Sequence, residues 1–78
     1  MENLIEDKLE TIYNNDCIFN VNYEGHDKIY NIYVILNVGP KYDFEFKYKI
    51  DDMFTFDYNI SRIRHIIDVN ILKLFMRY

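Results

Sequence analysis

The sequence predicts an α+β fold of order α-β-β-β-α, in which a three-stranded antiparallel meander packs against helices. Apolar residues recur at helical spacing near both ends of the chain. Between them lie three stretches in which apolar and polar residues alternate, as in strands with one buried face. Short turns around Gly25 and at Gly39 and Pro40 join these stretches, and short connections favour antiparallel neighbours.

The first helix is predicted over residues 2–14. Its apolar face consists of Leu4, Ile5, Leu9, Ile12 and Tyr13. Acidic residues occupy the other side, and acids early in a helix suit the helix dipole. The polar run at 14–16 is a stop signal.

The three predicted strands differ in how cleanly their two faces separate. In the first, Cys17, Phe19, Val21 and Tyr23 alternate with Ile18, Asn20 and Asn22. In the second, Tyr30, Ile32, Val34 and Leu36 share one face, and Ile29, Asn31, Tyr33 and Ile35 share the other. In the third, Tyr42, Phe44, Phe46, Tyr48 and Ile50 oppose Asp43, Glu45, Lys47 and Lys49. This third pattern predicts a buried aromatic face and a wet charged face.

A second helix is predicted near the C-terminus, capped by Asp51 and Asp52 or by Asp57. Its apolar face consists of Ile60, Ile63, Ile67, Ile71 and Leu74. Residues 69–77 also alternate, so a fourth strand is the competing interpretation of this stretch. Periodicity does not separate the two over so short a run, although we favour the helix.

Length and charge narrow the class of protein. We expect one domain over residues 1–78, because the chain is too short for two cores. The net charge is −4, whereas proteins that bind nucleic acid are usually basic. The charge is also uneven, since residues 1–16 are strongly acidic and residues 58–78 are basic. Direct nucleic-acid binding is therefore not expected of the surface as a whole.

Composition also suggests where the protein works. A lone cysteine, Cys17, makes no internal disulfide, and the acidic N-terminus does not resemble a signal peptide. No apolar run is long enough for a membrane span. Residues with AT-rich codons (Phe, Tyr, Met, Ile, Asn and Lys) exceed half of the chain, and alanine is absent. We therefore expect a cytoplasmic protein from an AT-rich genome, such as a low-GC bacterium, its phage or another virus.

No arrangement of reactive residues predicts an enzyme. Ser61 is the only serine, and Cys17 lies on the predicted core face, where thiols are usually inert. His26 and His65 lie in separate segments. The acids between residues 51 and 57 match neither a calcium loop nor a zinc motif. We expect no catalytic residues, no metal and no cofactor.

The layout of residues 1–50 resembles that of small acidic phage-encoded anti-CRISPR proteins, particularly an α-β-β-β-α inhibitor of Cas9. The shared features are the short acidic helix opening at Met1, the break at 14–16 and three strands joined by short turns. Residues 58–78 depart from that pattern, because they are basic where the inhibitor is acidic. The resemblance implies a non-enzymatic inhibitor that blocks a host protein or protein–RNA effector complex in the host cytoplasm.

Two sets of residues are candidates for contact with a partner. Acidic side chains that could mimic nucleic acid before a basic groove are Glu2, Glu6, Asp7, Glu10, Glu24 and Asp27. The alternative function is a small homo-oligomeric viral or phage structural protein, a homodimer in the simplest case. Its apolar patch on the outer sheet face would be Ile18, Ile29, Tyr33 and Ile35. A third hypothesis is nucleic-acid binding through Arg62, Arg64, His65, Lys73 and Arg77.

Overall fold

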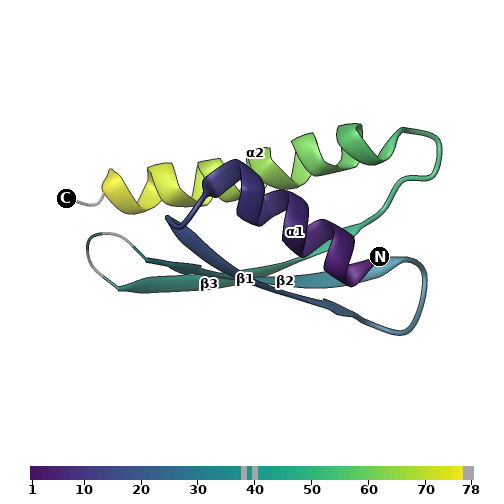
Figure 1. The fold of residues 1–78 in the computed structure, drawn as a ribbon, viewed down its shortest axis with the longest axis horizontal. Coiled ribbons are helices and arrows are strands. Elements are labelled where there is room, and N and C mark those ends of the chain that lie inside the picture. Colours follow the sequence, from purple (N-terminus) through teal and green to yellow (C-terminus); the bar gives the residue numbers. More distant parts are fainter. Residues whose placement is uncertain (38, 40, 77–78) are drawn as a thin grey trace.

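A computed structural model describes residues 1–37, 39 and 41–76. The elements in chain order are α1 (Glu2–Tyr13), β1 (Cys17–Tyr23), β2 (Ile29–Leu36), β3 (Tyr42–Lys49) and α2 (Phe56–Phe75) (Figure 1). The predicted α-β-β-β-α order and the α+β class are therefore confirmed.

The strands form one antiparallel sheet in the order β1-β2-β3. Both helices lie on the same face of this sheet, with α1 beside β1 and α2 running along the length of the molecule (Figure 1). Among the described residues, fifteen buried apolar side chains form the core between the helices and the sheet, and every element contributes to it. No described element covers the opposite face, which we call the outer face.

The second helix begins at a different residue from the one predicted. Thr55 is its N-cap, and the Thr55 hydroxyl accepts a hydrogen bond from the amide of Tyr58 at 3.1 Å. Asp51 instead closes a local turn, in which its carboxylate accepts from the amide of Met53. The helix continues to Phe75, so the alternative of a strand is wrong for residues 69–75, and residues 77–78 lie outside the described part.

The inner face of the sheet is buried unevenly. Each inward side chain of β2 is buried, because β2 is the central strand. On β3 the rings of Tyr42, Phe44 and Phe46 are only half-buried, although the sequence predicts a buried aromatic face. Neighbouring centroids in this row lie 6.0 and 6.4 Å apart. The cause is coverage, because α1 packs against the edge strand β1, whereas β3 forms the opposite edge of the sheet.

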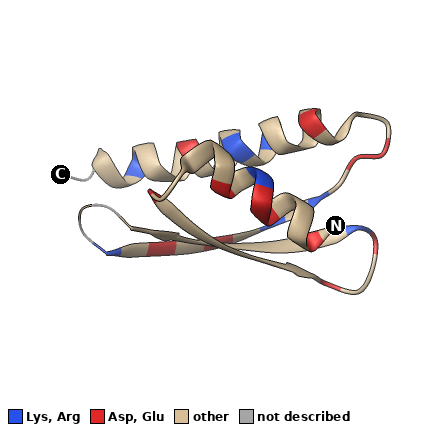
Figure 2. Cartoon of the chain, in the orientation of Figure 1, with Lys and Arg blue, Asp and Glu red and all other residues tan. Residues whose placement is uncertain are grey.

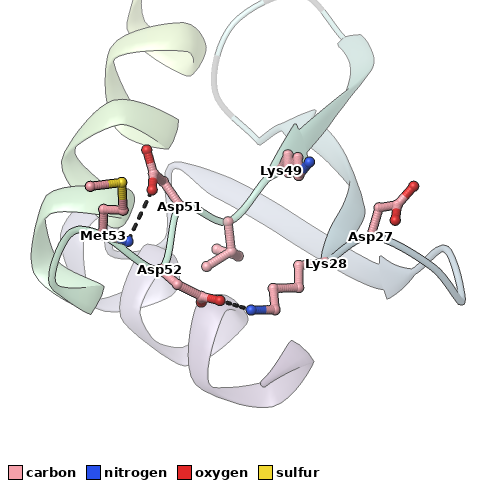
Figure 3. A pocket seen from close by; sticks show the side chains of 7 residues that line it. Asp27, Lys28, Lys49, Asp51, Asp52 and Met53 are labelled. Atoms are coloured by element: carbon pink, nitrogen blue, oxygen red, sulfur yellow. Dashed lines mark hydrogen bonds and ion pairs between the residues drawn. The ribbon is translucent and has the colours of Figure 1, made fainter.

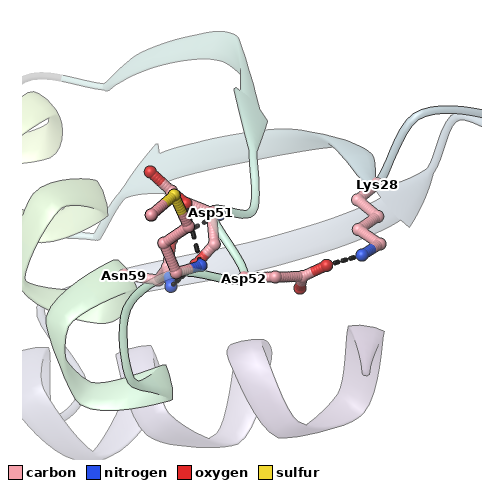
Figure 4. Close-up of polar contacts among 5 residues, drawn as sticks. Lys28, Asp51, Asp52 and Asn59 are labelled. Carbon is pink, nitrogen blue, oxygen red and sulfur yellow. Dashed lines mark hydrogen bonds and ion pairs between the residues drawn. The ribbon is translucent and has the colours of Figure 1, made fainter.

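One buried amide joins β3 to α2. Asn59 is 1% exposed, and its Oδ1 accepts hydrogen bonds from the Tyr48 hydroxyl at 2.8 Å and the Asp51 amide at 2.9 Å. Its Nδ2 donates to the carbonyls of Asp51 and Thr55, both at 3.0 Å. This amide thus uses both its acceptor and its donors to fix the path of the chain into α2 (Figure 4).

Candidate protein-binding surface

The acids of α1 fall into two groups once the helix is placed. Glu2 and Glu6 point at the edge of β1, where their carboxylates accept hydrogen bonds from backbone amides. Glu2 takes the amide of Tyr23 at 2.7 Å, and Glu6 takes the amide of Val21 at 3.0 Å. These two predicted partner-binding residues therefore also hold the fold together.

The match between the helix and the strand edge is geometric. Four residues of helix rise about 6 Å, and two residues of strand rise about 6.6 Å. Glu2 and Glu6, four residues apart on α1, therefore meet the amides of Tyr23 and Val21, two residues apart on β1, because helix and strand run in opposite directions. The outward amides of an edge strand are ordinarily open to another chain, and α1 occupies two of them here.

Asp7 and Glu10 form the second group. Both are exposed, and within the described residues neither carboxylate makes a hydrogen bond or an ion pair. Their charges are therefore available to a partner without any loss of internal contacts.

The remaining two predicted acids lie in the turn between β1 and β2. Glu24 lies 3.5 Å from the ammonium of Lys47, and Asp27 lies 3.4 Å from the imidazole of His26. Asp27 and Lys28 both adopt left-handed backbone conformations, with φ of 54° and 59°. Such conformations bend the chain sharply enough to connect the two strands.

Four of the six predicted acids lie on α1, and the other two lie in the turn beside the start of that helix. The contact of Glu2 with the end of β1 places the start of α1 beside the turn that carries Glu24 and Asp27. Figure 2 shows the red segments of α1 continuing toward the red segments of this turn. Acids that are distant in the sequence thus lie on neighbouring segments, and we call the acids of α1 together with this turn the α1 side.

The predicted apolar patch on the outer face is smaller than expected. Ile18 and Ile35 are direct neighbours across β1 and β2, and Tyr33 lies two positions along β2. The Tyr33 hydroxyl donates a hydrogen bond to the carboxylate of Asp43. Ile29 lies six positions from Ile35, at the far end of β2 opposite Lys49, so it is separate from the other three.

An aromatic and basic surface lies at the start of α2, and of its residues only Arg62 belongs to the predicted sites. The rings of Phe54 and Tyr58 stack with centroids 4.2 Å apart, and the guanidinium of Arg62 lies 5.9 Å from the Tyr58 centroid. These side chains are exposed. The only sequence signal for it is an aromatic pair four residues apart beside a basic segment.

Among the other basic residues of α2, Arg64 has an acidic partner. Arg64 lies 3.7 Å from Asp68 one turn further along the helix. The Tyr13 hydroxyl donates to Asp68 at 2.5 Å and so ties α1 to α2. Burial, together with this hydrogen bond, raises the pKa of the Tyr13 hydroxyl above its ordinary value.

A surface depression of about 590 Å³ lies between the β1–β2 turn and the segment that leads into α2 (Figure 3). An ion pair between Lys28 and Asp52 spans it. The Asp51 carboxylate is engaged by the amide of Met53, so both acids have internal partners. The ion pair ties the β1–β2 turn to the segment that leads into α2 (Figure 4).

The nucleophile and the histidines lie on different elements. Cys17 is buried at the start of β1, and burial raises the pKa of its thiol, which disfavours the reactive thiolate. His26 lies in the β1–β2 turn and His65 on α2. The described residues contain no cluster of three metal-ligating side chains.

In the described part of the chain, no helix combines the length and the apolar character that crossing a membrane requires. The chain matches no family model, no curated protein and no solved structure. Its function is therefore inferred from the arrangement of its own residues.

Proposed function

We propose that this protein is a non-enzymatic inhibitor that binds a basic protein surface through the α1 side. The observation that carries the proposal is the acidic surface of α1, whose start lies beside the turn that carries Glu24 and Asp27. Closely spaced carboxylates on a rigid edge resemble a row of phosphates. The partner class is a host protein or protein–RNA complex that handles nucleic acid, and a phage-encoded block of a CRISPR effector is the specific form.

Rigidity supports this proposal. A helix that docks through Ile5 and Leu9, both fully buried, holds its outward carboxylates in fixed relative positions. A preorganised acidic row loses little side-chain and loop entropy on binding. Asp7 and Glu10 are the residues most able to act, because they have no internal partner within the described chain.

Because some of these acids also stabilise the fold, the choice of variants matters for the test. Reversing Glu2 or Glu6 would break contacts to β1 and weaken the fold as well as any interface. Asp7→Lys with Glu10→Lys changes the same surface without touching those contacts. Asp57→Lys is a control, because Asp57 is an exposed acid in the first turn of α2.

The experiment is a tagged pull-down from nuclease-treated lysate of a low-GC bacterium that carries CRISPR systems, followed by kinetics on the captured complex. We expect one large partner, retained after nuclease treatment. Asp7→Lys with Glu10→Lys should slow association about tenfold at low salt, and this difference should shrink at high salt. Asp57→Lys should bind like the natural chain. Equal association rates for all three proteins at both salt concentrations would refute binding through the α1 side.

The homo-oligomeric alternative has one supporting observation, the contiguous Ile18 and Ile35 side chains on the outer face. Ile18 is 50% exposed. The variant Ile18→Lys with Ile35→Lys should yield a monomer if this patch is the contact between copies. Light scattering measures the change directly.

A further inference from the structure

We propose that the open edge of β3 is a second interaction surface, and that its partner is β3 of another copy of this chain. The two copies would pair antiparallel around Phe46 and join two three-stranded sheets into one of six strands. This inference does not rest on the proposed function, because Asp7 and Glu10, the acids tested for that function, lie on α1 at the opposite edge of the sheet from β3.

The two edges of the sheet differ in what covers them. The edge of β1 is covered by α1, whose Glu2 and Glu6 occupy outward amides. The edge of β3 has no partner strand within the described residues. β3 is eight residues long, and its inner-face rings are half-buried, so pairing would bury both backbone and aromatic surface.

The backbone of β3 shows which of its residues could pair. Ile50 donates a hydrogen bond to the Lys28 carbonyl at 3.0 Å, which identifies Lys28 and Ile50 as a hydrogen-bonded pair of the β2–β3 ladder. Such pairs recur at every second residue of an antiparallel ladder. The intervening residues therefore direct their amides and carbonyls outward, and they are Asp43, Glu45, Lys47 and Lys49.

The outward residues of β3 also carry a charge sequence that is complementary to itself. Read from the N-terminal end their signs are minus, minus, plus, plus, and the opposite direction reverses the order. Antiparallel pairing centred on Phe46 therefore places Glu45 opposite Lys47 of the second copy and Asp43 opposite its Lys49. By symmetry each pair occurs twice, and oppositely charged cross-strand pairs are stabilising.

Other registers fail this comparison. Opposite residues must both direct their backbone groups outward, so the register moves only in steps of two on one strand. One step in one direction places Glu45 opposite Glu45, and one step in the other places Lys47 opposite Lys47. Like charges directly opposite are destabilising, so the centred register is selected.

The inner face is compatible with the same register. Phe46 would lie opposite Phe46 of the second copy, and Phe44 would lie opposite its Tyr48. Aromatic cross-strand pairs add contact area, and the rings of Phe44 and Phe46 are only half-buried in a single copy. Lysines on an edge strand usually discourage pairing, but here each faces an acid. Lys47 keeps a 68% exposed side chain despite its contact with Glu24.

A charge swap tests the register by analytical ultracentrifugation of the full chain. Lys47→Glu creates two Glu–Glu oppositions and should weaken the dimer about ten- to thirtyfold, and Glu45→Lys should do the same. The double variant Glu45→Lys with Lys47→Glu restores opposite signs and should restore the dimer. A matched control is Ile18→Lys, which changes an exposed outer-face residue on β1, at the other edge of the sheet, and should leave the dimer intact.

Hydrogen exchange gives a second readout that does not depend on variants. The amides of Asp43, Glu45, Lys47 and Lys49 should become protected as protein concentration rises, whereas the intervening β3 amides are already bonded to β2. A chain that is monomeric at several hundred micromolar would overturn the proposal. A dimer that survives both single swaps, or that is lost in the outer-face control, would also overturn it.

Discussion

Replacing Asn59 with alanine should remove more stability than any other polar substitution in α2. The side chain is 1% exposed and makes four hydrogen bonds, so its loss leaves the Tyr48 hydroxyl and the Asp51 amide without their acceptor. It also removes the donor to two carbonyls. Each buried polar group left unsatisfied costs about 1–3 kcal/mol. Local relaxation and water entry reduce the sum, so we expect a loss of about 3–4 kcal/mol.

That loss is large for so small a chain. At roughly 0.05–0.15 kcal/mol per residue, 78 residues give about 4–12 kcal/mol in total. The midpoint of thermal unfolding should fall by about 4–8 °C for each kcal/mol. Urea denaturation followed by far-ultraviolet circular dichroism measures the free energy of unfolding, and tyrosine fluorescence provides a second probe because tryptophan is absent.

Asn70→Ala is the matched control in the same helix. Its Nδ2 donates only to the Ile66 carbonyl, at 2.9 Å, and the residue is half-buried. We expect a loss below about 1 kcal/mol. Equal losses for Asn59→Ala and Asn70→Ala would refute the claim that the Asn59 amide fixes the β3–α2 junction. A double-mutant cycle with Tyr48→Phe should show a coupling of about 1 kcal/mol.

Two further predictions concern contacts of α1. Glu6→Ala should lower the free energy of unfolding by about 1 kcal/mol in urea denaturation, because the Val21 amide loses its acceptor. Glu10→Ala is the control and should change the free energy of unfolding by less than about 0.5 kcal/mol. Equal losses for the two variants would contradict the conclusion that Glu6 stabilises the fold through its contact with β1. Alkaline pH should destabilise the protein, because burial and the bond to Asp68 raise the pKa of the folded Tyr13 above its unfolded value of about 10. The stability that the Tyr13 hydroxyl contributes is fully present below about pH 10 and is lost as the pH rises further. In Tyr13→Phe, the midpoint of thermal unfolding should therefore fall less steeply between about pH 9 and 12 than in the natural chain. An unchanged slope of the midpoint against pH would contradict the role given to Tyr13.

The element order could be predicted from the sequence because each element has its own periodicity. Alternation along β3 and helical spacing at Ile63 and Ile67 are local patterns, and burial follows them. The helix prevailed over a strand at 69–75 because Leu74 continues the buried helical face. Thr55 and the nearby aspartates are all good caps, so the choice among them depended on the path of the chain.

The candidate site was less accessible to sequence reasoning because it depends on the placement of elements. The prediction that Leu4 lies on the buried face of α1 was wrong, because Leu4 is 60% exposed. Nothing in the spacing of the acids shows that Glu2 and Glu6 meet the amides of β1. The separation of Ile29 from Ile18 and Ile35 follows from strand register alone. Asn59 looks like an ordinary polar helix residue until its four partners surround it.

On the ribosome the acidic cover of β1 is made before the strand that it protects. Synthesis runs from the N-terminus, so α1 emerges first, then β1, and each later strand adds to the opposite side of the growing sheet. The unfinished sheet therefore offers only its newest strand to a neighbouring nascent chain. Once β3 has emerged, the open edge of the sheet is β3 itself, which carries the self-complementary charges. Mispairing between growing chains is therefore limited to this edge, and its charges favour a single register.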